Sequence, residues 1–226
     1  MPRPQMLNGG TLEWREGART RAYGQNYQAS ILDRFGVWLS ARQIRRFIMP
    51  LAGKRLGDFG CGYHAAFVRS VLPELSQAVL VDVHLYPDLK NDSNVTAIEG
   101  ILPAVLSRVQ SASLDVVLCI NTLEHLWDPL TVLQECLRIV RPGGTCVFDV
   151  PSWRGKWFLE CSAFHLGLSP KDEMDDHKAY YDVKDFWPLL VRAGFRPSNI
   201  RCFSHKFGLN TFAVCRASNH STDSTQ

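Results

Sequence analysis

The feature that most constrains the fold is a glycine turn directly after a short apolar segment. Residues 55–59 have the pattern of a buried strand, and Gly60-Cys61-Gly62 follows at once. Glycine has no Cβ, so such a turn brings backbone N–H groups close to a ligand at the start of the next helix. The spacing Gly60-x-Gly62-x-x-Ala65 fits the dinucleotide fingerprint, although a simple strand-to-helix turn has the same pattern. The segment predicts an α/β fold.

Strand-like and helix-like segments alternate along most of the chain. Further strands are expected at residues 78–82, 95–98, 114–120 and 145–150, with helices at 65–72, 102–109 and 129–140 between them. This order predicts a Rossmann-like, doubly wound, mostly parallel seven-stranded sheet. A helix at 29–49 precedes the first strand, and a helix at 183–193 precedes a C-terminal antiparallel hairpin at 200–207 and 209–216.

Composition narrows the classes of function. The net charge of +3 over 226 residues is spread along the chain, which argues against a nucleic-acid partner. The seven cysteines form no C-x-x-C pair, which favours a reducing, cytoplasmic location over disulfides or a zinc site. We expect no signal peptide and no membrane span, because no apolar run reaches about 18 residues. The sequence leaves the oligomeric state open.

Two aspartates indicate what the glycine turn binds. Asp58 lies two residues before the first turn glycine, and Asp82 ends the next strand, 22 residues after Gly60. A carboxylate at position 82 can accept hydrogen bonds from both hydroxyls of a ribose. A carboxylate at position 58 would repel a pyrophosphate but suits a ligand with an ammonium group. The pair favours a ligand that carries both a ribose and an ammonium over a dinucleotide.

Further motifs follow in order: Val81-Asp82, Leu114–Val117, Leu123-Glu124-His125 and Arg141–Gly144. Together with Asp58-x-Gly60-x-Gly62, the set resembles the class I S-adenosylmethionine (SAM)-dependent methyltransferases, most closely their metal-independent small-molecule branch. The resemblance covers about residues 55–150 and continues weakly through 181–195. It implies SAM as cofactor, no metal ion, and transfer of a methyl group to a small-molecule acceptor.

The resemblance also implies a division of the chain and a set of cofactor-binding residues. Residues 1–50 would form a helical extension or lid, 51–216 the methyltransferase domain with an acceptor-side insert at 151–181, and 217–226 a disordered tail. The cofactor-binding residues would be Asp58, Gly60, Cys61, Gly62, Asp82, Val83, Gly100, Ile101, Cys119 and Ile120. Leu85 is a further candidate to flank the adenine.

Two positions depart from the family pattern. His64 stands where the family has a third glycine, which restricts the approach of the backbone there. Glu99-Gly100-Ile101 stands where the family often has Gly-Asp-Ala, so no acid at position 101 can hold the adenine amino group. Either a backbone group must make that contact or Glu99 must turn inward.

Histidine is the natural proton acceptor for a hydroxyl substrate, because its unperturbed pKa is about 6.5. His125 follows the fourth strand at the edge where ligands bind, and His177 lies in the insert; these are the candidate catalytic residues. The run Asp175-Asp176-His177 also raises the question of a metal, but three adjacent residues cannot readily converge on one ion, and no metal ligand is assigned.

The sequence predicts methyl transfer to a small polar acceptor, a hydroxyl of a sugar or a natural-product intermediate. Two alternatives stay open. The glycine spacing alone also suits an NAD-dependent oxidoreductase. The departures at His64 and Ile101 also suit a non-catalytic SAM-fold partner of another enzyme.

Overall fold

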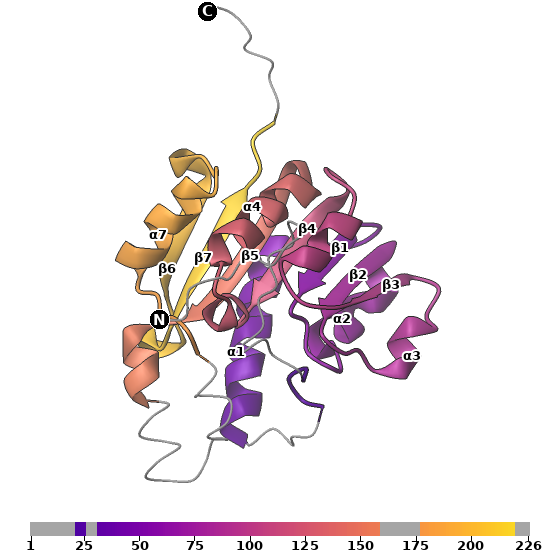
Figure 1. Cartoon of the computed structure of the whole chain (residues 1–226), viewed down its shortest axis with the longest axis horizontal. Helices are drawn as coiled ribbons and strands as arrows, with labels where there is room; N and C mark the ends of the chain where they lie inside the picture. Colours follow the sequence, from indigo (N-terminus) through magenta and orange to yellow (C-terminus); the bar gives the residue numbers. More distant parts are fainter. Residues whose placement is uncertain (1–20, 26–30, 159–176, 220–226) are drawn as a thin grey trace, which may run out of the picture.

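A computed structural model describes residues 21–25, 31–158 and 177–219. These residues form an α/β structure around one seven-stranded sheet of order β3-β2-β1-β4-β5-β7-β6 (Figure 1). The first five strands run parallel, and β7 pairs antiparallel with both β5 and β6. The predicted fold class, a Rossmann-like sheet with a C-terminal antiparallel hairpin, is confirmed.

The bounds of the elements follow the predicted ranges closely. The strands are β1 (Arg55–Phe59), β2 (Gln77–Asp82), β3 (Val95–Glu99), β4 (Leu114–Ile120), β5 (Val140–Pro151), β6 (Ile200–His205) and β7 (Asn210–Arg216). The α-helices are α1 (Ile31–Ile48), α2 (Ala66–Val71), α3 (Pro87–Lys90), α4 (Pro129–Ile139) and α7 (Val183–Arg192). Residues 153–158 are also helical.

Three local differences have physical reasons. The segment expected as a helix at 102–109 is a 3-10 helix at Ala104–Arg108, which begins directly after Pro103. The fifth strand begins at Val140 instead of residue 145, because the backbone on both sides of Arg141–Gly144 pairs with β4 across a register shift. The short helix α3 was not expected; it has Pro87 at its first position, where the missing N–H costs nothing.

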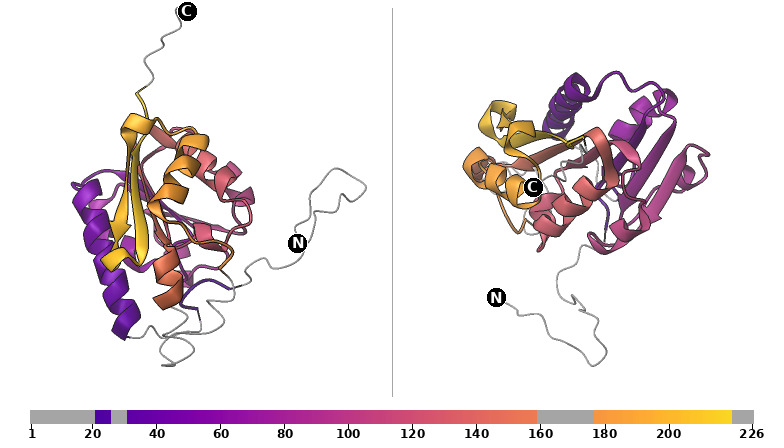
Figure 2. Two further views of the ribbon diagram at one scale, coloured as in Figure 1. Left: turned by 90° about the vertical axis from the view of Figure 1, so that its left-hand side faces the viewer. Right: turned by 90° about the horizontal axis from the view of Figure 1, so that it is seen from above.

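Helices cover both faces of the sheet and create two apolar layers. Figure 2 shows α1 on one face and α4 and α7 on the other. The layer under α1 and α2 includes Ile44, Ile48 and Val68, and the layer under α4 and α7 includes Leu133, Phe186 and Leu190. Because side chains along a strand alternate between the two faces of the sheet, Asp58 and Asp82 lie on the face that α1 and α2 cover.

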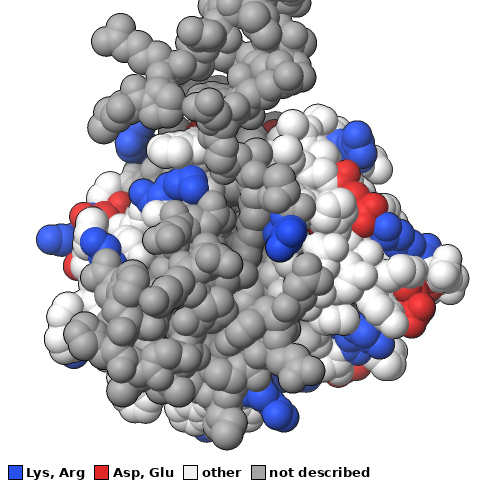
Figure 3. All heavy atoms as spheres, turned by 60° about the horizontal axis from the view of Figure 1, so that its bottom comes forward, with Lys and Arg blue, Asp and Glu red and all other residues white. Residues whose placement is uncertain are grey.

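Charge is mixed over the visible surface. On the face shown in Figure 3, Lys and Arg side chains of the described residues lie among Asp and Glu side chains and do not gather into one basic patch. No helix among the described residues is long and apolar enough to cross a membrane.

Candidate active site

The glycine turn is packed tightly between neighbouring strands. Gly60 and Gly62 have φ of +81° and +73°, which L-residues rarely adopt. A Cβ on Gly60 would lie 2.2 Å from Thr122 Oγ1, so this glycine is required by close packing against the end of β4. The Gly60 N–H donates to the carbonyl of Val81 at 2.7 Å. The turn follows β1 in the chain, is hydrogen-bonded to β2 and packs against the residue two positions after β4.

Asp82 fixes the shape of this turn through its side chain. Its Oδ2 accepts a hydrogen bond from the Gly62 N–H at 2.8 Å, and its Oδ1 accepts one from the Val83 N–H at 2.7 Å. An ionised carboxylate is an acceptor with about four lone-pair sites, which is the chemistry that ribose hydroxyls require of a partner. The residue predicted to hold the ribose therefore has the chemistry for it.

Asp58 is buried beside Asp82 at the end of β1. Its exposed fraction is 5%. Burial, and then the nearby charge of Asp82, raise the pKa of Asp58 from its ordinary 3.8 to about 7. A cationic ligand beside a carboxyl with a raised pKa lowers that pKa and so stabilises the ionised carboxylate. This site fits a ligand that presents an ammonium group and a ribose, as SAM does.

The predicted adenine end differs from the family pattern in a defined way. Glu99 Oε1 accepts a hydrogen bond from the Leu85 N–H at 2.8 Å and pairs with Lys90 Nζ at 2.7 Å, and both contacts lower the pKa of Glu99. Glu99 thus supports the Val83–Leu85 loop. Ile101 is 52% exposed, and Gly100 has φ of +151°. The side chain of Cys119 is fully buried, and Ile120 is partly buried at the end of β4.

Part of the predicted lid lies on the glycine turn. The Tyr63 N–H donates to the carbonyl of Tyr23 at 2.8 Å, which fixes residues 21–25 against the turn. His64 is exposed and packs against the rings of Tyr63 and Tyr86, with centroids 4.9 and 5.3 Å away. Residues 1–20 and 26–30 of the predicted N-terminal extension, with Tyr27 among them, lie outside the described residues, as do residues 220–226 of the predicted C-terminal tail.

The structure brings the two predicted catalytic histidines together. His125 ends a 3-10 helix, Leu123–His125, directly after β4, and its ring lies edge-on to that of His177 with centroids 4.7 Å apart. The Lys178 and Ala179 N–H groups both donate to the Glu124 carbonyl, at 2.6 and 3.2 Å, which fixes the segment that carries His177. Thr122, which packs against Gly60 of the glycine turn, immediately precedes this helix. Only Leu123 and Glu124 therefore separate His125 from Thr122.

The sequence analysis assigned no role to Glu124, although it lies between Leu123 and His125. Glu124 is 1% exposed, and burial raises its pKa to about 7, with His125 opposing that shift. Its Oε2 has no hydrogen-bond partner among the described residues. The available signal was an acidic residue four positions after the end of a strand with an almost wholly apolar sequence.

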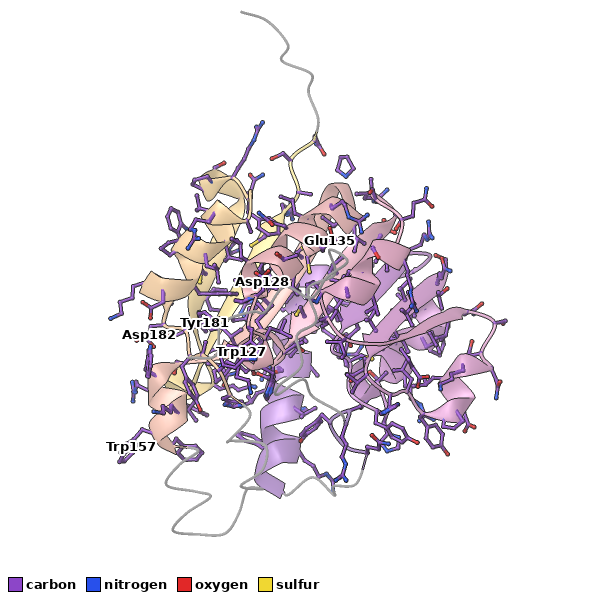
Figure 4. The ribbon with its side chains drawn as sticks, in the orientation of Figure 1. Trp127, Asp128, Glu135, Trp157, Tyr181 and Asp182 are labelled. Carbon is purple, nitrogen blue, oxygen red and sulfur yellow. The ribbon has the colours of Figure 1, made fainter. Side chains whose placement is uncertain are left out.

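Aromatic residues of the insert extend from the histidine pair. His177 Nδ1 lies 3.0 Å from Tyr180 Oη, and the Tyr180 ring lies 5.6 Å from that of Trp153. Lys156 Nζ lies over both rings, 5.7 and 5.8 Å from their centroids. A cavity of about 480 Å³ adjoins them, lined by Trp153, Arg154, Trp157, Phe158 and Leu209. Figure 4 shows Trp157 projecting outward from the 153–158 helix. Residues 159–176, with His165, Asp175 and Asp176, lie outside the described residues.

Comparisons with known proteins identify a matching family and several relatives. Residues 57–148 match the family described as "Methyltransferase domain". A "Ubiquinone biosynthesis O-methyltransferase" of Neisseria meningitidis serogroup A is 25% identical over 178 residues, 73% of each chain. A protein of the same name from Ralstonia nicotianae is 29% identical over 167 residues, 67% of each chain.

Solved structures show the same fold. One is the complex between the Haloferax volcanii Trm112 methyltransferase activator and a methyltransferase, with a TM-score of 0.60 and 15% identity over 81% of this chain and 90% of that one. Another is a SAM-dependent methyltransferase from Archaeoglobus fulgidus, with a TM-score of 0.59 and 14% identity over 81% of this chain and 94% of that one.

The seven-stranded sheet with its antiparallel β7 has the fold of these solved methyltransferases. The match to the family described as "Methyltransferase domain" covers residues 57–148, and together with the relatives it identifies the class of the chain as SAM-dependent methyltransferase. It is an enzyme of that class with SAM as its cofactor, and the NAD-dependent alternative is set aside.

Proposed function

We propose that the protein transfers the methyl group of SAM to a hydroxyl oxygen of a small polar acceptor, a sugar or a natural-product intermediate. The observation that carries this proposal is the cluster of Glu124, His125 and His177, two of which lie on the 3-10 helix that follows β4. The names of the relatives support an oxygen acceptor, since those proteins are O-methyltransferases.

The cofactor would be held by residues whose chemistry matches its parts. Asp58 would meet the methionyl ammonium, Asp82 the ribose hydroxyls, and Val83 with Leu85 would flank the adenine. Gly60, Cys61 and Gly62 would hold the methionine part, while the backbone of Gly100–Ile101 and of Cys119–Ile120 would line the rest. When bound, SAM supplies a methyl carbon that is already electrophilic because it is attached to a sulfonium.

The task left to this chain is to orient the acceptor and to take up its proton. Positioning of two reactants can supply about 7–11 kcal/mol in favourable cases. A proton acceptor within reach of the hydroxyl contributes about 10²- to 10⁴-fold. His125 and His177 are the groups at the end of β4 that can accept that proton, and Tyr180 orients the His177 ring through its contact with Nδ1.

The wall that continues from His177 suits an acceptor with a ring. Trp153 and Tyr180 offer ring faces for stacking, and Lys156 lies over both of them with its positive charge. Such a surface accommodates a sugar or an aromatic ring that carries polar substituents. Residues 151–181 would then select the acceptor, as the sequence predicts.

The test is methyl transfer from labelled SAM to a panel of hydroxylated sugars, phenols and polyketides, with products identified by mass spectrometry. His125→Gln and His177→Gln should each lower kcat by about 10²- to 10⁴-fold and leave the Kd for SAM within a few-fold of wild type. Arg192→Gln, at an exposed position in the last turn of α7, is the control. SAM binding without turnover on the whole panel would instead favour a non-catalytic partner. Stabilisation by NADH and not by SAM in a thermal-shift assay would contradict the proposal altogether.

A further inference from the structure

We propose that Glu124, His125 and His177 together bind a divalent transition-metal cation of the zinc class. One ligand atom from each of these residues lies within 4.8 Å of the others. Two of the three are sequence neighbours on the 3-10 helix after β4, and the third comes from the insert, 52 positions further on. The family resemblance implied no metal, and the convergence depends on a fold contact that no local sequence pattern shows.

The donor set determines the kind of ion. Two imidazoles and one carboxylate suit Zn²⁺ and its first-row neighbours, whereas Mg²⁺ prefers an all-oxygen, octahedral shell. Three protein ligands with a fourth position left open are typical of catalytic zinc sites. Since zinc bonds of about 2.0–2.2 Å place tetrahedral ligands roughly 3.3–3.5 Å apart, the ion would draw these donors closer by side-chain rotation. Residues 177–182 belong to no helix or strand, which permits this adjustment at His177.

Glu124 supplies an observation independent of the histidines. Its side chain is 1% exposed, and Oε2 makes no hydrogen bond within the described part of the chain. A buried carboxylate oxygen without a partner is costly, and buried charges are normally paired or coordinate a metal. A cation between Glu124 and the histidines would satisfy that oxygen.

Groups around the cluster have the arrangement of a supporting shell. A histidine that binds a metal usually makes a hydrogen bond through its other ring nitrogen, which fixes the ring. Tyr180 Oη lies 3.0 Å from His177 Nδ1, so Nε2 is the nitrogen that would meet the ion. The two N–H groups that donate to the Glu124 carbonyl fix the backbone of both ligand segments relative to each other.

A role of the ion in methyl transfer rests on the proposed function, whereas the binding of the ion to these three residues does not. With the ion in place the histidines act as ligands and not as proton acceptors; an acceptor hydroxyl in the open position would have its pKa lowered by the metal and would lose its proton to solvent. Methyl transfer would then stop when a chelator removes the ion and return when the ion is added back. Transfer that is insensitive to the chelator would leave the histidines as proton acceptors and would deny the ion a catalytic role.

The test is titration of the tag-free full chain with Co²⁺, and then Zn²⁺, after dialysis against a chelator. We expect one ion per chain, a visible Co²⁺ spectrum of nitrogen and oxygen ligation, and displacement by Zn²⁺. His177→Ala, at a partly buried position, should weaken Co²⁺ binding by more than about 100-fold, and Tyr180→Phe by about 10- to 100-fold. His84→Ala, which removes an exposed histidine elsewhere, should leave binding unchanged. Glu124→Gln should also weaken Co²⁺ binding, and circular dichroism confirms that this variant is folded.

Three outcomes would overturn the metal site: no Co²⁺ binding up to millimolar concentration, equal binding by wild type and His177→Ala, or a thiolate charge-transfer band that places the ion on a cysteine. SAM binding measured on the same samples separates the two proposals. Co²⁺ binding without SAM binding would leave the metal site standing and the proposed function refuted.

Discussion

Asp58→Asn is the substitution that best examines the electrostatics of the cofactor pocket. The pKa of Asp58 is raised from 3.8 to about 7 in the folded chain. Between these two values the unfolded chain has lost the proton and the folded chain keeps it, so the free energy of unfolding falls as pH rises. Each pH unit within that window costs about 1.4 kcal/mol. From pH 5 to pH 8, Asp58 alone should therefore lower the stability of the ligand-free protein by about 2 to 3 kcal/mol.

Asparagine has nearly the same shape and does not titrate. Urea unfolding at pH 5 and pH 8 should show that the difference between the two pH values shrinks by about 2 to 3 kcal/mol in Asp58→Asn. Part of the pH dependence should persist, because the pKa of Glu124 is also raised to about 7. Asp88→Asn removes an exposed carboxylate from α3 and serves as the control. An unchanged pH difference in Asp58→Asn would refute the assignment of a buried, protonated carboxyl at this position.

Three further substitutions examine the packing and charges around the site. Gly60→Ala should destabilise the chain by about 1 to 3 kcal/mol in urea unfolding, because its Cβ would meet Thr122 at positive φ; stability equal to wild type would contradict this contact. Asp82→Asn should raise the Kd for SAM about 10- to 100-fold by calorimetry, since charge-assisted hydrogen bonds are lost; an unchanged Kd would remove Asp82 from the site. Lys206→Met should lower the free energy of unfolding by about 3 to 5 kcal/mol in urea, because it removes the cation that pairs with the fully buried Asp149. Adding Asp149→Asn should restore much of the lost stability. A double variant no more stable than Lys206→Met would exclude the broken ion pair as the cause.

The sheet could be predicted from local patterns because each strand carries its own signal. The parallel strands β2 and β4 are buried along most of their length and contain the apolar runs 78–81 and 116–120, and Asp128 before Pro129 marks the start of α4. The Asp128 side chain does accept the Thr131 N–H as a helix cap. Periodicity and caps are local properties, so one sequence suffices to find them.

The acceptor side could be predicted only in part because it depends on contacts between distant segments. His125 and His177 were each recognised as titratable groups near the ligand edge, but nothing local indicated that they would lie in contact. Glu124 was missed because its proximity to His177 depends on the contact of its carbonyl with residues 178–179, which lie more than 50 positions away in the sequence. The engagement of Glu99 by Lys90 was missed for a similar reason, since it required the unexpected helix α3.

The most direct measurement is the affinity for SAM by calorimetry between pH 5 and pH 7, for wild type and Asp58→Asn. If the ionised Asp58 carboxylate binds the ammonium of the cofactor, affinity should rise roughly 50-fold over this range in wild type and stay flat in the variant. Affinity that is independent of pH in both proteins, or no binding at millimolar SAM, would contradict the account.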